Sequence, residues 1–597
     1  MMLLPHLKLS AAAVALTATA TIVKASSFEN NLAYNSPSRR HPSLAVPLAH
    51  IYKRQTGDLF TPNELSFTHG VASGDPYDTS VILWTRLAPT TENVASDLVP
   101  GGIVPIYSDP EAAQPSSKAA CVEFQISTSK TFDTVVDSGR AYTTSDVDYT
   151  VKFEAANLQP FTVYYYRFNV CDASKVSSVG RLRTLPEKGK KVGRNVKLAV
   201  YSCSNYPEGY FNAYGNAVRK DTIDWWIHLG DYIYEYKDSD VRTALPDRET
   251  YTLYDYRKRH ATYRTDPDLL NIHSAFAGIF TWDDHEVADN SWKNGSLNSE
   301  GEVFQKRKQA AVRAYFEWMP IRQVDMDDSL RIWRSFAVGD LFDLFMLDTR
   351  QYNRDLTVLN GIAGIGGNSK EVEKLVDLQN RTIMGFNQEE WFYKGLRESK
   401  AKWKLVGSQV IFSRMTLGNL LGNQAINRDQ WDGYLANRDR VYETLEGGKI
   451  NNTVFLAGDS HAAWVSDLAW LGKREYDENT GKGAFGVELA GSAVSSASVL
   501  TGYVPRFISD GVSGLLIKAN PELQWQDLFY RGYFEIEVGY GELKGEFWGV
   551  KDLKKRNGEE KLLARFLVRD GENKLARNPS VGGGVAYAGA LKGGKVE

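Results

Sequence analysis

The sequence predicts a two-part protein, an all-β domain followed by an α/β core. Between residues 66 and 190, short runs rich in Val, Ile, Tyr and Thr alternate with turn signals, which is typical of a small sandwich. Between residues 191 and 550, apolar strands alternate with segments of helical period, which is typical of an α/β domain with largely buried strands. Acidic, His and Tyr residues follow several of those strands, where open α/β sheets bind ligands.

The individual elements follow from these patterns in chain order. In the first part we predict strands at residues 80–87, 119–127, 149–155 and 161–170. The basic, Gly-containing stretch Lys188–Arg194 is interpreted as a linker. In the second part we predict helices at residues 306–319 and 387–403, and strands at residues 196–202, 224–230, 277–282, 341–348, 402–412, 452–458 and 483–491.

The two ends of the chain differ from the middle. The apolar, Ala-rich run Leu9–Val23 is shorter than a membrane span, and small residues at Val23 and Ala25 suit cleavage, so residues 1–25 are predicted to be a signal peptide. A retained signal anchor or an N-terminal core helix is the alternative. Residues 26–65 are interpreted as an extended arm, and residues 551–597 as a charged, then Gly-rich tail.

Composition bounds the possible partners. The 597 residues are 43% hydrophobic and 24% charged, which suits a large protein with a substantial core. The net charge of -3 leaves no basic excess for nonspecific binding of a polyanion, so no specific nucleic-acid binding is expected. No segment after residue 25 is apolar for long enough to span a bilayer.

Cysteines and glycosylation motifs both fit an extracellular route. Cys121 and Cys171 lie in two strand-like runs and are predicted to form a disulfide. Cys203 would then be unpaired, either as a thiolate held by a metal or as a buried structural cysteine. Glycosylation triplets begin at Asn294, Asn380 and Asn451.

The stretch HLGDYIYEY, residues 228–236, ends an apolar run on Asp231 and Tyr234. One turn can present this carboxylate and this phenol to the same centre. Because Tyr has a reference pKa of about 10, phenolate ligation at neutral pH needs a strongly acidic cation, and trivalent iron fits better than zinc or magnesium. An ordinary aromatic position in an aromatic-rich strand is the alternative for Tyr234.

Two further clusters also follow apolar strands. Asp283, Asp284 and His285 are consecutive, and adjacent carboxylates repel each other unless a cation or a proton separates them. Asp459 and His461 are two residues apart, so both side chains can face one site. A solvated turn explains each cluster alone. Their joint occurrence at strand ends predicts a metal-dependent phosphate site.

Five separated blocks resemble, in sequence and order, the PhoD family of secreted alkaline phosphatases and phosphodiesterases, within the calcineurin-like and purple-acid-phosphatase-like metallophosphoesterases. The resemblance runs from residue 67 to residue 550 and implies a fibronectin-like β domain followed by a two-sheet metallophosphoesterase sandwich flanked by helices. The blocks are SCS around Cys203, GDYIYEY, TWDDHEVADN, LDTRQYN and LAGDSH, with THGVASGDPYDTSVILWTRLAP upstream.

The resemblance also implies two kinds of metal that share Asp231. Asp284 and Asp459 stand where the wider superfamily has an Asn and a His, and this oxygen-rich set suits calcium better than zinc. The ligands implied for Fe(III) are Cys203, Asp231, Tyr234 and His461.

Three more residues receive roles from the resemblance. His285 is a candidate to protonate the leaving alkoxide or to position the substrate. Asn290 and Arg350 are candidates to bind phosphate oxygens, Arg because its planar fork matches them. For Arg350, a structural ion pair with Asp348 or Asp355 is the alternative.

The implied function is that of a secreted phosphatase, extracellular or bound to the cell wall, which hydrolyses phosphomonoesters or phosphodiesters at alkaline pH. Fe(III) would supply the attacking hydroxide, and Ca(II) would neutralise the phosphate charge. Small-molecule phosphate esters are the expected substrates, phospholipids are a further candidate, and we expect a monomer. Two alternatives stay open: a phospholipase D-type phosphodiesterase acting on lipid head groups, and a non-catalytic secreted binding protein.

Overall fold

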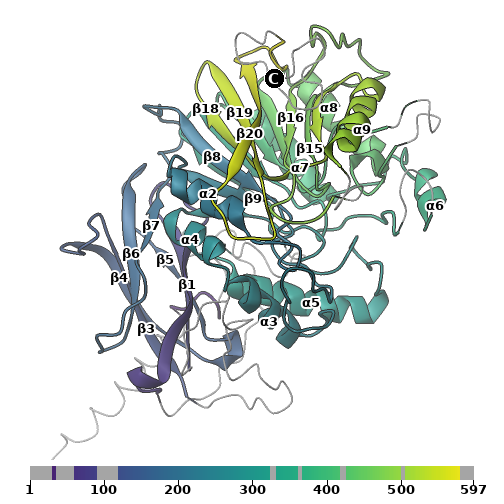
Figure 1. The fold of residues 1–597 in the computed structure, drawn as a ribbon. Coiled ribbons are helices and arrows are strands. Elements are labelled where there is room, and N and C mark those ends of the chain that lie inside the picture. Colours follow the sequence, from purple (N-terminus) through teal and green to yellow (C-terminus); the bar gives the residue numbers. More distant parts are fainter. Residues whose placement is uncertain are drawn as a thin grey trace, which may run out of the picture.

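The computed structural model describes residues 30–34, 59–89, 118–322, 331–360, 366–416, 418, 425–498 and 505–577. The early strands form a β-sandwich at the lower left of Figure 1, and later residues form a larger body of sheets and helices at the upper right. The predicted α/β architecture with a β domain in front of it is confirmed.

The largest sheet has nine strands in the order β20-β19-β18-β8-β9-β10-β1-β2-β5. Its centre is parallel, because β8 pairs with β9 and β9 with β10 in that sense. All four residues of β9 are buried, as expected for a strand covered on both faces. The strands are β1 (Leu65–Gly74), β2 (Val81–Pro89), β5 (Thr150–Ala155), β8 (Val196–Tyr201), β9 (Trp225–His228), β10 (Gly278–Phe280), β18 (Arg531–Val538), β19 (Glu542–Val550) and β20 (Glu560–Arg569).

A second sheet has seven strands in the order β11-β12-β13-β14-β16-β15-β17. Here β12, β13, β14 and β16 are parallel neighbours, and β11, β15 and β17 join antiparallel. The strands are β11 (Arg334–Val338), β12 (Phe342–Met346), β13 (Trp403–Gly407), β14 (Thr453–Ala457), β15 (Ala463–Asp467), β16 (Val487–Ala490) and β17 (Leu523–Asp527).

The two large sheets face each other across a common apolar core. Leu198 and Ile227 of the first sheet belong to the same buried cluster as Leu405 and Leu456 of the second. Helices α2 and α4 cover the outer face of the first sheet, and α7 and α8 cover that of the second. The helices are α2 (Asn212–Lys220), α3 (Leu253–Tyr263), α4 (Pro267–Ala275), α5 (Gly301–Trp318), α6 (Ser369–Glu373), α7 (Phe386–Glu398), α8 (Leu435–Gly447) and α9 (Arg506–Ala519), with short 3-10 turns η2 (Pro62–Glu64), η4 (Ser145–Val147) and η6 (Trp431–Gly433).

The N-terminal sandwich shares a sheet with the larger body. Its second layer is β4-β3-β6-β7, formed by β3 (Ala120–Ser127), β4 (Val135–Thr143), β6 (Val163–Val170) and β7 (Gly180–Arg183). This layer packs on β1, β2 and β5, where Phe153 stacks on Phe168 with ring centroids 6.3 Å apart. Strand β1 also pairs with β10 at Gly74 and Gly278, so the first sheet continues through both parts. The likeness to fibronectin domains stays a prediction.

The predicted linker is held against the second sheet. The amide of Gly189 donates to the carbonyl of Gly339, and the amide of Asp340 donates to that of Lys190, both at 2.9 Å. These contacts join the linker to the turn between β11 and β12. The linker is therefore attached to the larger body through its backbone.

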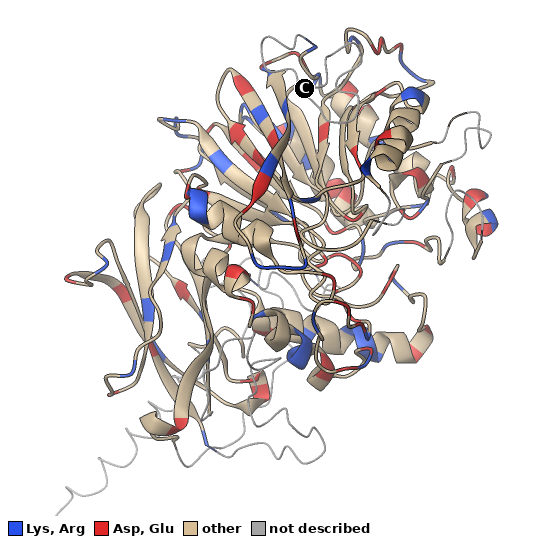
Figure 2. Cartoon of the chain, in the orientation of Figure 1, with Lys and Arg blue, Asp and Glu red and all other residues tan. Residues whose placement is uncertain are grey.

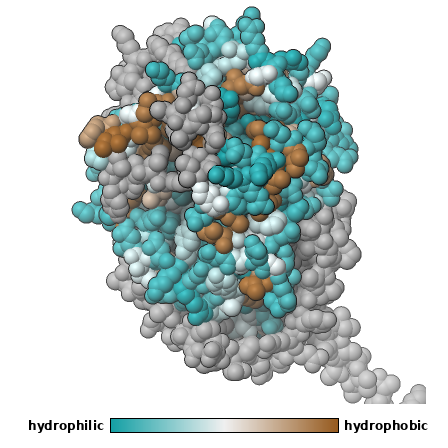
Figure 3. All heavy atoms as spheres, turned by 90° about the vertical axis from the view of Figure 1, so that its right-hand side faces the viewer, coloured by the Kyte–Doolittle hydropathy of each residue, from teal (hydrophilic) through white to brown (hydrophobic). Residues whose placement is uncertain are grey.

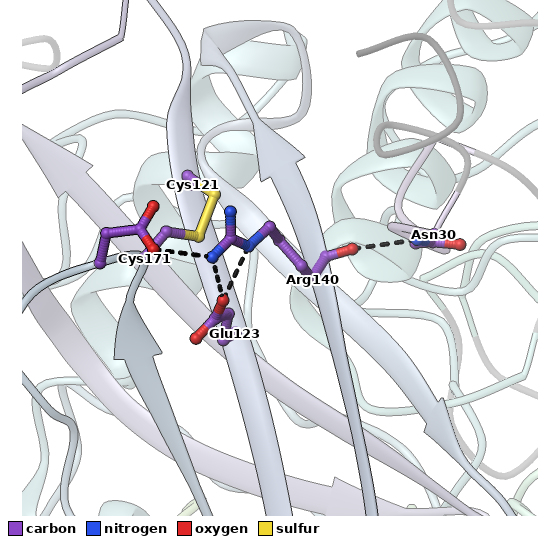
Figure 4. Close-up of a disulfide and its surroundings, with 6 residues drawn as sticks. Asn30, Cys121, Glu123, Arg140 and Cys171 are labelled. Atoms are coloured by element: carbon purple, nitrogen blue, oxygen red, sulfur yellow. Dashed lines mark hydrogen bonds and ion pairs between the residues drawn. A yellow bond between two sulfur atoms is a disulfide. The ribbon is translucent and has the colours of Figure 1, made fainter. Parts of the chain in front are cut away.

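The predicted disulfide between Cys121 and Cys171 is confirmed, with Cα atoms 5.4 Å apart (Figure 4). It joins the start of β3 to the residue after β6. Beside it, Arg140 donates to Glu123 at 2.7 Å and to Asp172 at 3.0 Å. The bridge therefore ties together neighbouring strands that an ion-pair network also links.

Two segments pack more closely than the sequence indicated. Asn31, within the expected arm, is fully buried: its side-chain amide donates to Tyr142 and Thr150, and its oxygen accepts from Ala33 and Lys152. Strand β20 lies within the expected tail, where a run of apolar residues pairs with β19. The signal peptide and residues 578–597 lie outside the described residues.

The surface mixes both signs of charge. Acidic and basic side chains are interspersed over the sheets and helices (Figure 2), in keeping with the small net charge. The face shown in Figure 3 is largely hydrophilic, with separate apolar patches. Among the described residues, we find no helix with both the length and the hydropathy that a bilayer span requires.

Candidate metal centre

The predicted ligand clusters meet where the parallel strands of both sheets end. Such a position is expected for open α/β sheets, because loops leaving the carboxyl ends of neighbouring strands converge. Cys203 follows β8, Asp231 follows β9, Asp283 to His285 follow β10, Arg350 follows β12, and Asp459 and His461 follow β14.

The loops that carry these residues turn sharply. Cys203, Asp231, Asp459 and His461 have φ values of 60°, 56°, 63° and 53°, in a left-handed region that few non-glycine residues occupy. Such backbones gather at functional sites, where packing over-determines them. Gly230 allows one of these turns, because a Cβ there would lie 2.4 Å from the Cβ of Asp283.

One side of the centre, which we call the thiol half, consists of Cys203, Asp231, Tyr234 and His461. The Tyr234 hydroxyl lies 3.0 Å from Oδ2 of Asp231 and 3.1 Å from Nε2 of His461. One potential ligand atom of each of Cys203, Asp231 and His461 lies within 4.8 Å of the others. Nδ1 of His461 donates to the Ala497 carbonyl at 2.7 Å, which leaves the lone pair on Nε2 facing the other ligands.

The thiol half is crowded with groups that burial keeps neutral. Burial raises the pKa of the Cys203 thiol well above its usual value, and Asp231 adds to this rise. Burial also raises the pKa of Tyr234, with Asp231 and Cys203 adding to it. Desolvation lowers the pKa of His461 to about 4, so its imidazole is neutral at neutral pH. A cation bound here would supply the positive charge that thiolate and phenolate both need.

The other side, which we call the acidic half, consists of Asp283, Asp284 and Asp459 around Arg350. One oxygen of each carboxylate lies within 4.8 Å of the others. The fully buried guanidinium pairs with Asp283, Asp459 and Asp429, and lies 3.8 Å from Asp284. Desolvation raises the pKa of Asp459 to about 6 although Arg350 opposes the rise. One guanidinium is therefore the main counter-charge for four carboxylates.

The ion pairs of Arg350 are not those considered from the sequence. Asp348 accepts from the backbone amide of Arg350 at 3.0 Å and from the indole of Trp282 at 2.7 Å. Asp355 pairs with Lys293 at 2.6 Å. The guanidinium instead reaches carboxylates that lie far away in sequence.

His285 lies between the two halves with both ring nitrogens engaged. Nδ1 lies 2.7 Å from the buried Glu235 carboxylate, and Nε2 lies 2.9 Å from the Tyr236 hydroxyl. The ring stacks on Tyr234 with centroids 4.3 Å apart. Burial lowers the pKa of His285, but Glu235, Asp284 and Asp231 outweigh it and raise the pKa well above its usual value. The surrounding carboxylates therefore favour the protonated form of His285.

The donor atoms fit cations shared between the halves. Oδ1 of Asp231 and Oδ1 of Asp284 are buried and lack a hydrogen-bond partner among the described residues, which is costly for a carboxylate without a cation. Asp231 belongs to two of the ligand groups, one with Cys203 and His461 and one with Asp284 and His285. A thiolate, a phenolate and an imidazole suit iron, whereas the all-oxygen group of Asp283, Asp284 and Asp459 suits calcium.

Asn290 joins this cluster through its backbone. Its amide donates to Oδ2 of Asp284 at 2.6 Å, and it has a left-handed φ of 50°. Asn290, Tyr236, Asp459 and His461 are half-buried, whereas Asp231, Tyr234 and Arg350 are buried. The half-buried residues therefore mark the side of the site that faces solvent.

Sequence reasoning missed several residues that contact the site. Asp429 lies in an irregular segment, where no strand end marks it, and it pairs with both Arg350 and Arg354. Ser496 lies in a Ser-rich stretch that resembles a plain loop, and its hydroxyl contacts Tyr234 at 2.7 Å. Glu235 was visible inside the GDYIYEY block, next to a predicted ligand, and only its contact with His285 shows its role.

Comparison with known proteins gives consistent matches. Residues 198–547 match the family model described as PhoD-like phosphatase, and residues 54–186 match its N-terminal domain. The chain is 34% identical over 531 residues to alkaline phosphatase D of Bacillus subtilis (strain 168), covering 87% of this chain and 84% of that protein.

Two solved structures extend the comparison. A structure of PhoD superposes with a TM-score of 0.74 at 32% identity, covering 90% of this chain and 95% of the other. The purple acid phosphatase PPD1 from yellow lupin seeds superposes with a TM-score of 0.52 at 10% identity, covering 85% of this chain and 75% of that one. The second likeness concerns the fold alone, and supports the metallophosphoesterase-like arrangement of the two sheets.

Proposed function

This chain belongs to the PhoD-like phosphatase family and is a phosphoesterase hydrolase, and from that premise we propose that it hydrolyses phosphate esters at a centre holding Fe(III) and Ca(II). The family membership favours an enzyme over the alternative of a non-catalytic binding protein. The proposed iron ligands are Cys203, Asp231, Tyr234 and His461, and the proposed calcium ligands are Asp231, Asp284 and Asp459.

The observation that carries this proposal is the contrast in donor atoms around the shared Asp231. On one side it meets a thiol, a phenol and an imidazole, and on the other it meets the carboxylate of Asp284, which itself groups with those of Asp283 and Asp459. When bound, such cations lower the pKa of water and neutralise phosphate charge. The chain supplies the frame that brings ester and water together, because the ligands belong to loops fixed by two rigid sheets.

The protonated His285 is proposed to donate a proton to the leaving oxygen. Glu235 holds one side of its ring, so the other nitrogen faces the half-buried Tyr236 on the open side of the site. The half-buried Asn290 is proposed to bind a phosphate oxygen on the same side. Both residues thus lie where an ester can approach.

Arg350 is proposed to bind phosphate oxygens only once cations occupy the acidic half. In the structure each nitrogen of its guanidinium donates a hydrogen bond to a carboxylate. If Asp459 and Asp284 turn to calcium, part of the guanidinium becomes free for an anion, while Asp429 still holds it in place.

Metal analysis and colour test the proposed function together. Phenolate bound to Fe(III) gives a visible charge-transfer band, so the purified protein is expected to be coloured and to contain iron and calcium. Assays of a soluble monoester and a soluble diester establish which ester is hydrolysed. A colourless, active protein that contains only zinc would contradict the proposed metals.

Phospholipid head groups are a second candidate substrate, which the surface of α9 favours. Phe507 is 74% exposed and Leu515 is 54% exposed, and the chain reaches this helix after the site segment that contains Ser496. Activity on phosphatidylcholine vesicles, compared with a soluble choline diester, tests this candidate. Phe507→Ser should then reduce only the vesicle activity, whereas equal activity on both substrates in the unaltered protein would exclude a lipid preference.

We also propose secretion, from the predicted signal peptide and the confirmed disulfide. Asn294, Asn380 and Asn451 are exposed and so accessible to glycosylation. Mass determination of the secreted protein before and after enzymatic deglycosylation tests both points.

A further inference from the structure

The segment Val494–Ala497, which follows β16, contacts three of the four proposed iron ligands. The amide of Val494 donates to the Ser202 carbonyl at 2.9 Å, and the amide of Ser496 donates to the Cys203 carbonyl at 3.3 Å. The Ala497 carbonyl accepts from Nδ1 of His461 at 2.7 Å. The segment therefore orients the cysteine through its backbone and the histidine through its ring.

Its contact with the third ligand is made by a side chain. The Ser496 hydroxyl oxygen lies 2.7 Å from the hydroxyl oxygen of Tyr234 and 3.0 Å from the carbonyl oxygen of Cys203. Ser496 is 1% exposed, so water does not compete for this hydroxyl. A serine hydroxyl has one proton, which it can direct to only one of these two acceptors at full strength.

Metal ligation decides between the two acceptors. A Tyr234 oxygen bound to a cation has lost its proton and can only accept, and a hydrogen bond to an anionic oxygen is stronger than one to a neutral carbonyl. The shorter of the two contacts of Ser496 is already the one with Tyr234. Ligation would thus direct the Ser496 proton to the phenolate.

The surroundings hold Ser496 in this position. Arg531 donates to the carbonyls of His461 and Ser496, and the neighbouring Ser495 hydroxyl donates to the Asn205 carbonyl at 2.7 Å. The Glu208 carboxylate accepts from the amide of Ala497. The segment is therefore anchored on both sides of Ser496, so its hydroxyl is preorganised toward Tyr234.

We propose that Ser496 is a positioning residue that holds the Tyr234 phenolate by a hydrogen bond and sets the energy of its charge-transfer band. The inference rests on the proposed function, because it needs iron bound by Tyr234. A hydrogen-bond donor to the phenolate oxygen lowers the energy of the filled phenolate orbital from which an electron is transferred to iron. The hydrogen bond therefore raises the energy of the charge-transfer transition. Groups around metal ligands commonly adjust them in this way.

The test compares three variants of the full chain by visible absorption and iron content. In Ser496→Ala the band should move to longer wavelength by on the order of 10 to 30 nm, the scale of one charge-assisted hydrogen bond. Ser496→Thr retains a hydroxyl and should return the band toward its original position. Ser495→Ala is the matched control, because its hydroxyl anchors the same segment to the Asn205 carbonyl but contacts no ligand, so its band should move much less than that of Ser496→Ala.

The outcomes separate this inference from the proposed function. A colourless or iron-free unaltered protein would refute the iron assignment itself. A coloured protein whose band is the same in Ser496→Ala, at equal iron content, would overturn the role of Ser496 alone. If Ser496→Ala loses its iron while Ser495→Ala retains it, restoration of iron and band by Ser496→Thr supports the role, and failure of that restoration refutes it.

Discussion

The two halves of the candidate metal centre are held in different ways. In the thiol half, neutral groups orient two ligands: the Ser496 hydroxyl donates to Tyr234, and the Ala497 carbonyl accepts from His461. In the acidic half, the charge of Arg350 holds Asp283 and Asp459. Ligands held by neutral groups keep their geometry with or without a cation, whereas carboxylates held by a guanidinium must exchange one positive charge for another. We therefore expect the thiol half to retain its metal and the acidic half to exchange its metal with solvent.

Replacing the shared ligand should have the largest effect, because it acts on both halves. Asp231→Asn is expected to abolish turnover, since an amide donates less charge to either cation. Activity on a soluble monoester and metal content per chain measure the result. Asp247→Asn, which alters an exposed carboxylate paired with Lys237, is the control and should be unaffected. Substantial activity in Asp231→Asn would show that the halves do not share this ligand.

Chelation should separate the halves without altering the chain. EGTA is expected to inactivate the protein while its colour persists, because calcium leaves the acidic half and iron stays with the thiolate and phenolate. Activity should return with calcium rather than zinc. Loss of the colour together with the activity would show that both halves bind their metals equally weakly.

Truncating Arg350 should affect the acidic half alone and more mildly. Arg350→Ala is expected to cost about 2 to 4 kcal/mol of transition-state stabilisation, which is the effect of losing one positioned donor, with iron and colour intact. Arg350→Lys retains the positive charge but lacks the planar guanidinium, so it should lose less activity than Arg350→Ala. If Arg350→Ala instead unfolds or loses iron while activity per folded molecule is unchanged, Arg350 is a structural ion-pair partner.

The smallest effect is expected from Glu235, which acts through His285 between the halves. Its carboxylate is the main group that raises the pKa of His285, so Glu235→Gln should lower that pKa. His285 loses its proton as pH rises through its folded-state pKa, so the alkaline limb of the rate profile should move to lower pH. We expect a loss of roughly 10-fold on esters with alkoxide leaving groups, in line with other groups that orient a functional side chain.

Esters with good leaving groups provide the internal control for Glu235. A phenolate departs without help from an acid, so hydrolysis of an aryl ester should change little in Glu235→Gln. Equal losses on both kinds of ester would mean that Glu235 supports the fold and not proton donation.

Much of the fold followed from local pattern. The predicted strands at residues 119–127 and 161–170 correspond to β3 and β6. Alternating apolar and polar residues, or a continuous apolar run, mark such strands in the sequence. The run at residues 402–412 was predicted as one strand, yet β13 ends at Gly407. The chain turns there because the buried Gln409 amide donates to Thr281 and Leu347, and so bridges the loops of both sheets. Strand β4 was missed, since only two of its nine residues are buried.

The sequence alone predicted which ligand blocks meet at the candidate centre, because each block follows an apolar strand and adjoining strand ends meet at one edge of a sheet. It also determined the disulfide, through two cysteines in pairable strands. Only the tertiary structure decided the partners of those residues. Arg350 meets Asp429 across 79 positions of sequence, and Ser496 meets Tyr234 across 262. The local sequence pattern indicates which residues are buried and which backbone conformation they adopt. The contacts that orient the site residues and set their charge depend on how the two sheets pack.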